Sequence, residues 1–182
     1  MIEDPWYTDR RAQWKPEIVR CLLIAESAPD DDGDSARRRF FYDEDLTRYD
    51  GLFREVVKAI LGESPGEAAP GAKTAWLRRL RDEGVFLIDL AAVPVNYHTA
   101  AARHDALAEN IADCVEQAGS LKPDGLIVVK KNVFEILERP LRTAGLPLLH
   151  DEFIPFPGSG QQKRFRERFA TAYGKLPEVG LH

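Results

Sequence analysis

Residues 20–29 read Arg-Cys-Leu-Leu-Ile-Ala-Glu-Ser-Ala-Pro, an apolar run that ends in a carboxylate and a proline. A short, continuously apolar run, without alternation, is typical of a strand that is buried on both faces of a parallel sheet. Three further runs share this character, at residues 85–90, 125–129 and 146–149. The first run therefore predicts a buried parallel strand with Glu26 at its carboxyl end.

The segments between and after these runs have helical periodicity. Apolar residues recur there at the spacing of one helix face, in the segments 50–61, 73–83, 105–118, 132–144 and 163–173. Strands that alternate with helices require right-handed crossovers, which place helices on both faces of the sheet. We therefore expect an α/β protein, a three-layer α/β/α sandwich around a central four-stranded parallel sheet.

The chain has the size and composition of one globular domain. Its 182 residues are 44% hydrophobic and 30% charged, as in an ordinary single domain. We expect one domain over residues 1–182, in which residues 1–16 form an N-terminal arm and residues 174–182 form a C-terminal tail. The aromatic side chains of the arm are expected to pack it onto the sheet.

The cysteines and the apolar runs indicate the compartment. Cys21 and Cys114 are the only cysteines, too few and too far apart for a disulfide framework or a zinc site. Free cysteines suit a reducing compartment, and the acidic N-terminus does not resemble a secretory signal. The longest apolar run, residues 85–95, contains Asp89 and Pro94 and is too short to span a bilayer. We expect a cytoplasmic monomer with no metal, no cofactor and no membrane partner.

The net charge of −5 excludes a protein that coats nucleic acid through a uniformly basic surface. Basic stretches are nevertheless present at residues 37–39, 130–131 and 163–168. Each one alone is most often a solvated face. The first runs directly into Phe40 and Phe41, and cations beside aromatic rings are typical of a surface that binds phosphates and bases. DNA is therefore the expected partner, although we expect at least one of these rings to anchor the loop to the core.

In open α/β sheets, ligands bind beyond the carboxyl ends of the strands. Glu26 follows the first strand and Asp89 ends the second, with Asn96 in the loop that follows. Both carboxylates are candidates for catalysis and Asn96 for base binding; the alternative for a loop acid is a bond to nearby backbone N–H groups. The last strand-end loop is glycine-rich and precedes a predicted helix, so it can hold a phosphate, unless Ser159 is only an N-cap. Its phosphate-binding candidates are Gly158, Ser159, Gly160, Gln161, Lys163 and Arg164.

Three of these segments are similar to motifs of one family. Residues 22–29 resemble a strand followed by Gly-Glu-Ala-Pro-Gly, and residues 85–89 resemble a strand that ends in a base-reading Asn. Residues 156–159, Phe-Pro-Gly-Ser, resemble a His-Pro-Ser or Asn-Pro-Ser motif. With this order and spacing, the chain resembles the uracil-DNA glycosylase superfamily from Cys21 to about Tyr173, and its first motif is closest in style to the iron–sulfur type.

The resemblance implies an enzyme that flips a base out of the stack and hydrolyses its N-glycosidic bond. Under it, Glu26 stabilises positive charge on the sugar or orients water, and Phe40 or Phe41 stacks on the base. Asp89 stands where the family has its base-reading Asn, and Phe156 stands where it has its catalytic His. The four cluster cysteines are missing. We therefore expect weak or altered uracil activity and no iron–sulfur cluster.

Two other classes of function are open at this point. One is a non-catalytic DNA-binding or damage-sensing module of the same fold. The other is a small-molecule enzyme that uses Glu26 and Asp89 as an acid/base pair on a nucleotide or sugar phosphate. DNA affinity that falls steeply with salt favours a DNA partner, whereas a nucleotide that stabilises a chain without DNA affinity favours the small-molecule enzyme.

Overall fold

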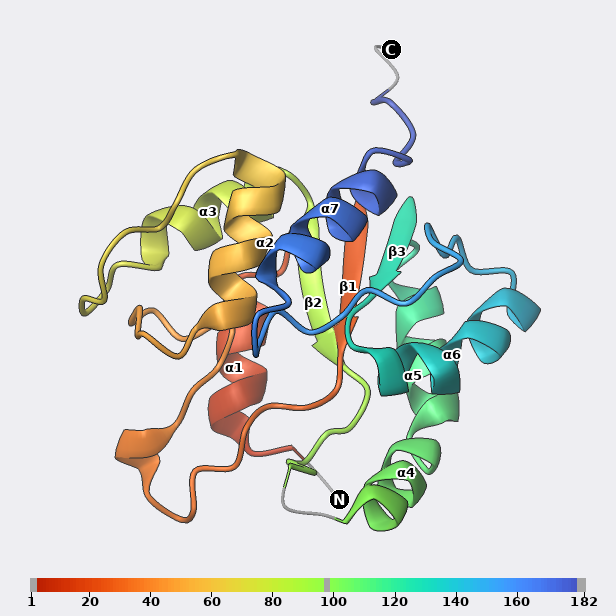
Figure 1. Ribbon diagram of the computed structural model, residues 1–182, viewed down its shortest axis with the longest axis horizontal. Helices are drawn as coiled ribbons and strands as arrows, with labels where there is room; N and C mark the ends of the chain where they lie inside the picture. The colour runs from red at the N-terminus through yellow and green to blue at the C-terminus, as the bar shows by residue number, and fades with distance from the viewer. Residues whose placement is uncertain (1–2, 97–98, 180–182) are drawn as a thin grey trace.

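The computed structural model describes residues 3–96 and 99–179. Within these residues the chain is an α/β fold with an open parallel sheet of three strands (Figure 1), which confirms the predicted α/β class. The strands, in the spatial order β2-β1-β3, are β1 (Cys21–Ala25), β2 (Val85–Asp89) and β3 (Gly125–Val128). They start level with one another, because Cys21 pairs with both Val85 and Gly125. All three carboxyl ends therefore lie at the same edge.

Helices cover the sheet. Figure 1 shows α2 and α7 side by side in front of the strands, and every residue of β1 and β3 is buried, so both faces of the sheet are covered. None of the described helices is long and apolar enough to cross a membrane. The helices are α1 (Pro5–Gln13), α2 (Gly51–Leu61), α3 (Thr74–Asp82), α4 (Ala100–Ala108), α5 (Ile111–Ser120), α6 (Lys131–Thr143) and α7 (Gln162–Tyr173), with a short 3-10 helix η1 (Ser35–Arg37).

The sheet has three strands where the sequence predicted four. The run 146–149 meets the edge of β3 only through an isolated parallel bridge between Leu126 and Leu148. The carbonyl of Pro147 accepts a hydrogen bond from the N–H of Leu126 at 2.9 Å. The N–H of Leu149 donates in return to the carbonyl of Leu126 at 2.9 Å. Pro147 has no N–H with which to extend this pairing toward the start of β3, so a regular ladder does not form along this run.

A histidine side chain replaces the next backbone partner of β3. The N–H of Val128 donates to Nε2 of His150 at 3.0 Å, and Nδ1 of the ring lies 2.8 Å from the carbonyl oxygen of Glu152. An imidazole that accepts at Nε2 carries its proton at Nδ1, so this ring is neutral. Burial lowers the pKa of His150, and the ring stacks on Phe134. His150 is therefore a core-edge residue that closes the sheet.

The expected N-terminal arm is a helix, α1, within its described residues. Asp4 accepts a hydrogen bond from the N–H of Trp6 at 2.8 Å and Pro5 occupies the first helical position, which are both helix-start signals. Tyr7 and Trp14 are buried in the core, so aromatic residues do pack this segment onto the fold. Residues 1–2 of the arm and 180–182 of the tail lie outside the described residues.

The predicted helix over residues 105–118 is two helices, α4 and α5, which meet at Asn110. The side-chain amide of Asn110 donates to the carbonyl of Ala106 at 2.7 Å. Asn side chains compete with the backbone for such bonds, and this competition favours helix ends over helix interiors. The chain therefore changes direction within a stretch whose apolar spacing continues.

Candidate functional site

A pocket of about 250 Å³ lies at the carboxyl ends of the strands. Its lining includes Glu26 after β1, Asp89 at the end of β2 and Lys130 after β3. The three strand ends therefore contribute charged groups to one cavity, at the place where open α/β sheets bind ligands. Other residues of its wall are Arg39, Phe40, Phe41, Tyr49, Asn96 and Phe156.

Glu26 is buried, and both of its oxygens have a partner. Oε1 accepts a hydrogen bond from Nζ of Lys130 at 2.9 Å, and Oε2 accepts one from Nδ2 of Asn132 at 2.6 Å. The two donors fix the orientation of the carboxylate. Each carboxylate oxygen has two lone pairs, so each retains acceptor capacity for a ligand or a water molecule.

Lys130 has an unusual backbone. Its φ is 85° and its ψ is 136°, a region that residues other than glycine rarely adopt, at a cost of about 1–3 kcal/mol. Such conformations cluster at functional sites, and here the strained residue carries the ammonium that binds Glu26. The next residue, Lys131, points elsewhere and pairs with Glu135 at 3.8 Å. The sequence shows these two lysines only as a basic stretch. It does not predict the contact between Lys130 and Glu26, because no local sequence signal marks a positive φ at a lysine.

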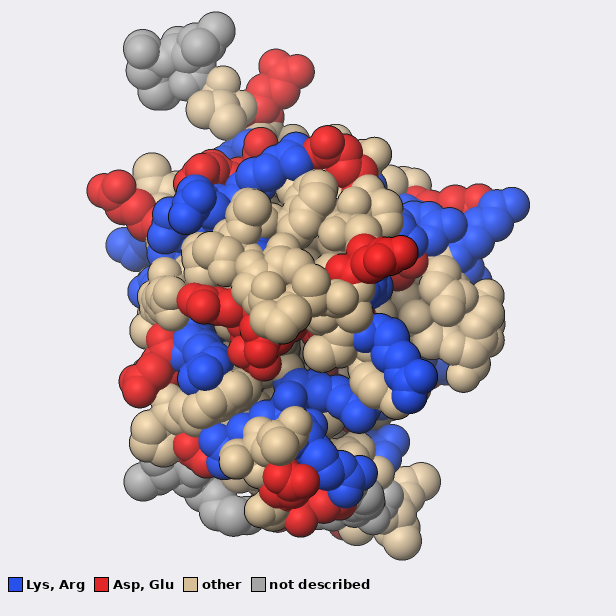
Figure 2. Space-filling view, turned by 90° about the vertical axis from the view of Figure 1, so that its left-hand side faces the viewer, with Lys and Arg blue, Asp and Glu red and all other residues tan. Residues whose placement is uncertain are grey.

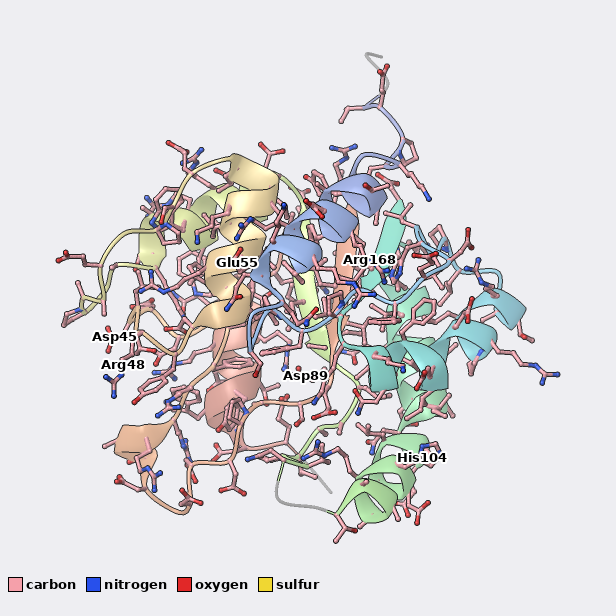
Figure 3. All side chains as sticks on the ribbon, viewed as in Figure 1. Asp45, Arg48, Glu55, Asp89, His104 and Arg168 are labelled. Atoms are coloured by element: carbon pink, nitrogen blue, oxygen red, sulfur yellow. The ribbon has the colours of Figure 1, made fainter. Side chains whose placement is uncertain are left out.

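Asp89 binds an arginine from α1. Its Oδ2 accepts a hydrogen bond from Nη2 of Arg11 at 2.9 Å, and Nη1 of the same guanidinium binds both oxygens of Glu3. Burial raises the pKa of Asp89 to about 6, although Arg11 acts in the opposite direction. Figure 3 shows Asp89 at the arrow end of β2. The N-terminal helix therefore binds the Asp89 side chain, although no residue of α1 lines the pocket itself.

The aromatic loop contributes two rings to the pocket, of which one is buried in the core and the other is half-buried. Phe40 is buried and packs edge-on against Tyr7 and Tyr42, which confirms that at least one ring anchors this loop. Phe41 is half-buried and packs against Phe53 with ring centroids 5.2 Å apart. Both lining rings belong to the pocket wall, but Phe41 is the more accessible of the two candidates for contact with a base.

Asn96 lies in the loop after β2 and also lines the pocket. Its Oδ1 accepts a hydrogen bond from the backbone N–H of Asp30 at 3.1 Å. Arg103 donates to the carbonyl of the same residue at 2.8 Å. Asn96 is exposed, so its amide group ties the loops after β1 and β2 together at the rim of the pocket.

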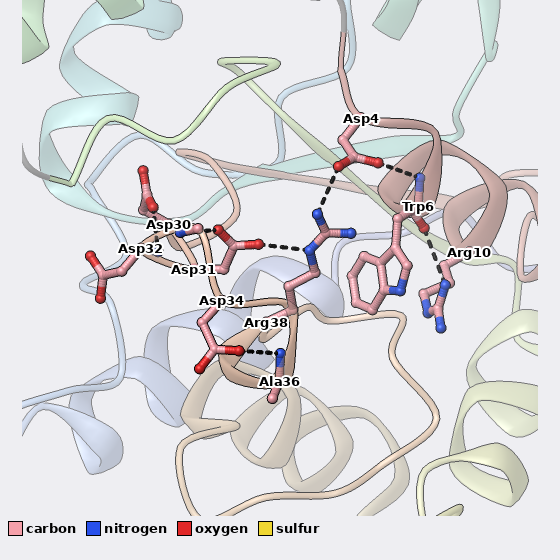
Figure 4. A network of polar contacts seen from close by, with 10 residues as sticks. Asp4, Trp6, Arg10, Asp30, Asp31, Asp32, Asp34, Ala36 and Arg38 are labelled. Atoms are coloured by element: carbon pink, nitrogen blue, oxygen red, sulfur yellow. Dashed lines mark hydrogen bonds and ion pairs between the residues drawn. The ribbon is translucent and has the colours of Figure 1, made fainter.

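Two of the three arginines in the first basic stretch are paired with acids. Nε of Arg38 donates to Asp31 at 2.7 Å, and its Nη2 donates to Asp4 at 2.8 Å (Figure 4). Arg37 pairs with Asp32 at 2.7 Å. The neighbouring aspartates therefore neutralise most of the charge that the sequence suggested for phosphate contacts.

The glycine-rich loop before α7 contributes Phe156 to the pocket. Its other candidates are not in the pocket wall, and these are Gly158, Ser159, Gly160, Gln161, Lys163 and Arg164. Ser159 is exposed with a φ of 49° and is not the N-cap, which is Gln161. Lys163 pairs with Glu167 at 3.8 Å. The fold therefore brings Phe156, but not the expected phosphate-binding turn, to Glu26 and Asp89.

Neither metal clusters nor known relatives identify the site. Among residues 3–96 and 99–179, no group of three or more His, Cys, Asp or Glu side chains could hold a metal ion. No family model matches the chain, and no curated protein matches it significantly. The chemistry of the pocket is therefore the basis on which its function is inferred.

Proposed function

We propose that the chain is a DNA glycosylase that receives an extruded base in this pocket and hydrolyses its N-glycosidic bond. The observation that carries the proposal is the pair formed by the Glu26 carboxylate and the Lys130 ammonium, 2.9 Å apart in the pocket wall. Cleavage of this bond develops positive charge on the sugar and negative charge on the departing base, and fixed charges aimed at such groups stabilise a transition state. The resemblance to the uracil-DNA glycosylase superfamily supports the same reaction.

Glu26 has the properties required on the sugar side. Its carboxylate is fixed by Lys130 and Asn132, so it does not have to reorganise when charge develops nearby. The lone pairs that these donors leave unused can accept a hydrogen bond from a water molecule. The oxygen of this water attacks the anomeric carbon as the bond to the base breaks, and its proton passes to Glu26. Glu26 thus orients the water and stabilises the cationic sugar.

Lys130 has the properties required on the base side. An ammonium has three N–H donors, and the hydrogen bond to Glu26 uses one of them. A second N–H can therefore donate to a carbonyl oxygen of the departing base. This donor would replace the histidine of the family that the sequence resembles, at whose position this chain has Phe156, a side chain without a polar hydrogen.

The size and lining of the pocket suit a single base. Ligand pockets commonly have volumes of about 300–1,000 Å³, and this one has about 250 Å³. Phe41 gives it apolar wall area, which can pack against the face of a planar ring. These features favour one base over a dinucleotide or a larger cofactor.

The proposal is tested by base release from oligonucleotides that each carry one uracil, hypoxanthine or xanthine, in single-stranded and duplex form. The protein is expected to release at least one of these bases and leave an abasic site. Glu26→Gln should lower the rate on the order of 10²–10³, the effect of removing one electrostatic catalyst. Glu135→Gln, a change of an exposed acid on α6, is the control and should retain the full rate. Release of no base, or an unchanged rate in Glu26→Gln, would overturn the proposal.

A further inference from the structure

Two large aromatic side chains are exposed among the described residues, and both line the pocket. The exposed fractions are 53% for Tyr49 and 46% for Phe156. The other large exposed hydrophobic residues, Ile18 and Val179, do not line it. Isolated exposed apolar residues are ordinary, but exposed aromatics that gather at a pocket mouth are typical of a binding surface.

Tyr49 holds two arginines whose charge is not neutralised by an acid. The guanidinium carbon of Arg39 lies 3.7 Å from the centroid of the Tyr49 ring, and that of Arg48 lies 4.6 Å from it. Arg48 also donates a hydrogen bond to the Tyr49 hydroxyl. In the described part of the chain, neither arginine forms an ion pair with a carboxylate. Figure 3 shows Arg48 directed outward, and Arg39 is partly exposed in the pocket wall. A guanidinium group binds phosphate through two parallel N–H donors.

Three of the four basic residues in the predicted patch at residues 163–168 pair with acids, and the fourth, Arg164, lies over the ring of Phe153. On the side of the molecule that lies to the left in Figure 1, Figure 2 shows Lys and Arg side chains interspersed with Asp and Glu, without a broad basic face. Duplex binders usually neutralise many phosphates over a wide basic surface. Arg39 and Arg48, which form no ion pair with an acid among the described residues, are too few to make such a surface. They can instead bind the phosphates of a single DNA strand. The pairs in the patch of residues 163–168 are Lys163 with Glu167, Arg166 with Glu55, and Arg168 with Glu152.

From these observations we infer that the mouth of the pocket binds single-stranded DNA. Arg39 and Arg48, which both lie over the ring of Tyr49, bind backbone phosphates. Phe156 stacks on the base next to the extruded one. Bases stack on aromatic side chains whatever their sequence, whereas the bases of a duplex are already stacked on one another. The inference rests on the proposed function and adds to it the form of DNA that the protein accepts.

The test uses an undamaged oligonucleotide as a single DNA strand, as a duplex with its complement, and as RNA of the same sequence. Affinity is measured by fluorescence anisotropy over about 50–200 mM salt. The single DNA strand should bind most tightly, with a slope of log K against log salt near −1.4, about −0.7 for each of two phosphates. Arg39→Gln with Arg48→Gln should remove that slope, and Phe156→Ala should weaken binding on the order of tenfold, the loss of one stacked base.

Two control variants separate local effects from general ones. Ile18→Ala removes an exposed apolar side chain that does not line the pocket, and Arg139→Gln removes an exposed cation on α6. Both should bind like the unmodified protein. The inference is overturned if the duplex or the RNA binds as tightly as the single DNA strand, or if the mouth variants behave like the controls.

Base release measured on the same variants distinguishes this inference from the proposed function. Base release without a preference for single strands would remove the inference and leave the glycosylase. A single-strand preference that depends on Phe156 and Arg39, in a protein that releases no base, would support the inference as a binding surface and remove the glycosylase.

Discussion

Nη2 of Arg11 lies 2.9 Å from Oδ2 of Asp89, although the two residues are 78 positions apart in the sequence. The contact joins the N-terminal helix to the end of β2, where the family that the sequence resembles has its base-reading residue. One oxygen of Asp89 is therefore occupied by a cation. Burial nevertheless raises the pKa of this carboxyl to about 6, so its protonation state changes close to neutral pH.

This pKa predicts how the protein handles uracil. An ionised Asp89 only accepts hydrogen bonds and opposes a carbonyl oxygen, whereas a protonated one can donate to it. Uracil release should therefore rise as the pH falls through about 6. Asp89→Asn should raise release at pH 7 about tenfold, within the roughly 1–3 kcal/mol of a corrected base contact, and flatten the pH profile. Single-turnover rates from pH 5 to 8 measure both effects. Efficient uracil release by the unmodified protein at pH 7, lost in Asp89→Asn, would contradict this role.

The same carboxyl predicts a pH-dependent stability. Its pKa is about 6 in the folded protein and about 3.9 in an unfolded chain, so the folded state binds more protons between these values. The contribution of Asp89 to the free energy of unfolding should therefore decrease as the pH rises from about 4 to 6 and stay constant above that. Urea denaturation of the unmodified protein and of Asp89→Asn, compared at each pH, isolates this group. A difference that does not vary with pH would show that the pKa of Asp89 is not raised.

Lys130 is predicted to act on the departing base. Lys130→Met keeps the aliphatic stem but removes the donor, and should lower the rate of base release on the order of 10²–10³. Affinity for undamaged single-stranded DNA should change little, because that contact is expected at the pocket mouth. Lys131→Met is the matched control, since its side chain pairs with Glu135, and it should keep the full rate. Equal rates in the two variants would exclude Lys130 as the donor.

A buried ion pair beneath the aromatic loop is predicted to carry much of its stability. Lys73 is 0% exposed, and its Nζ binds Oδ1 of Asp50 at 2.6 Å and the carbonyl of Phe40 at 2.9 Å. Lys73→Met leaves Asp50 buried without its cation and should cost about 3–5 kcal/mol. The double variant Lys73→Met with Asp50→Asn should recover part of this loss. Urea denaturation measures both, and an unaffected single variant would show that the pair contributes little.

The sequence predicted what depends on local pattern. Continuous apolar runs located β1, β2 and β3, and the position of Glu26 after the first run placed it at the carboxyl edge of the sheet, where the pocket lies. The run at residues 146–149 does not form the predicted fourth strand. Pro147 has no N–H to donate, and the His150 side chain takes the place of a backbone partner of β3. The Arg11–Asp89 contact and the positive φ of Lys130 leave no local signal, since they arise from tertiary packing.

The most direct measurement concerns the charge that Glu26 is proposed to stabilise. It compares two single-stranded oligonucleotides in which one sugar is replaced by a cationic pyrrolidine ring or by a neutral tetrahydrofuran ring. The cationic ring imitates the charge of the transition state, and such analogues bind at least on the order of 10² more tightly than ground-state ligands. We predict that the unmodified protein prefers the cationic ring by about this factor and that Glu26→Gln loses the preference. Equal affinity of the unmodified protein for the two rings would contradict the glycosylase assignment.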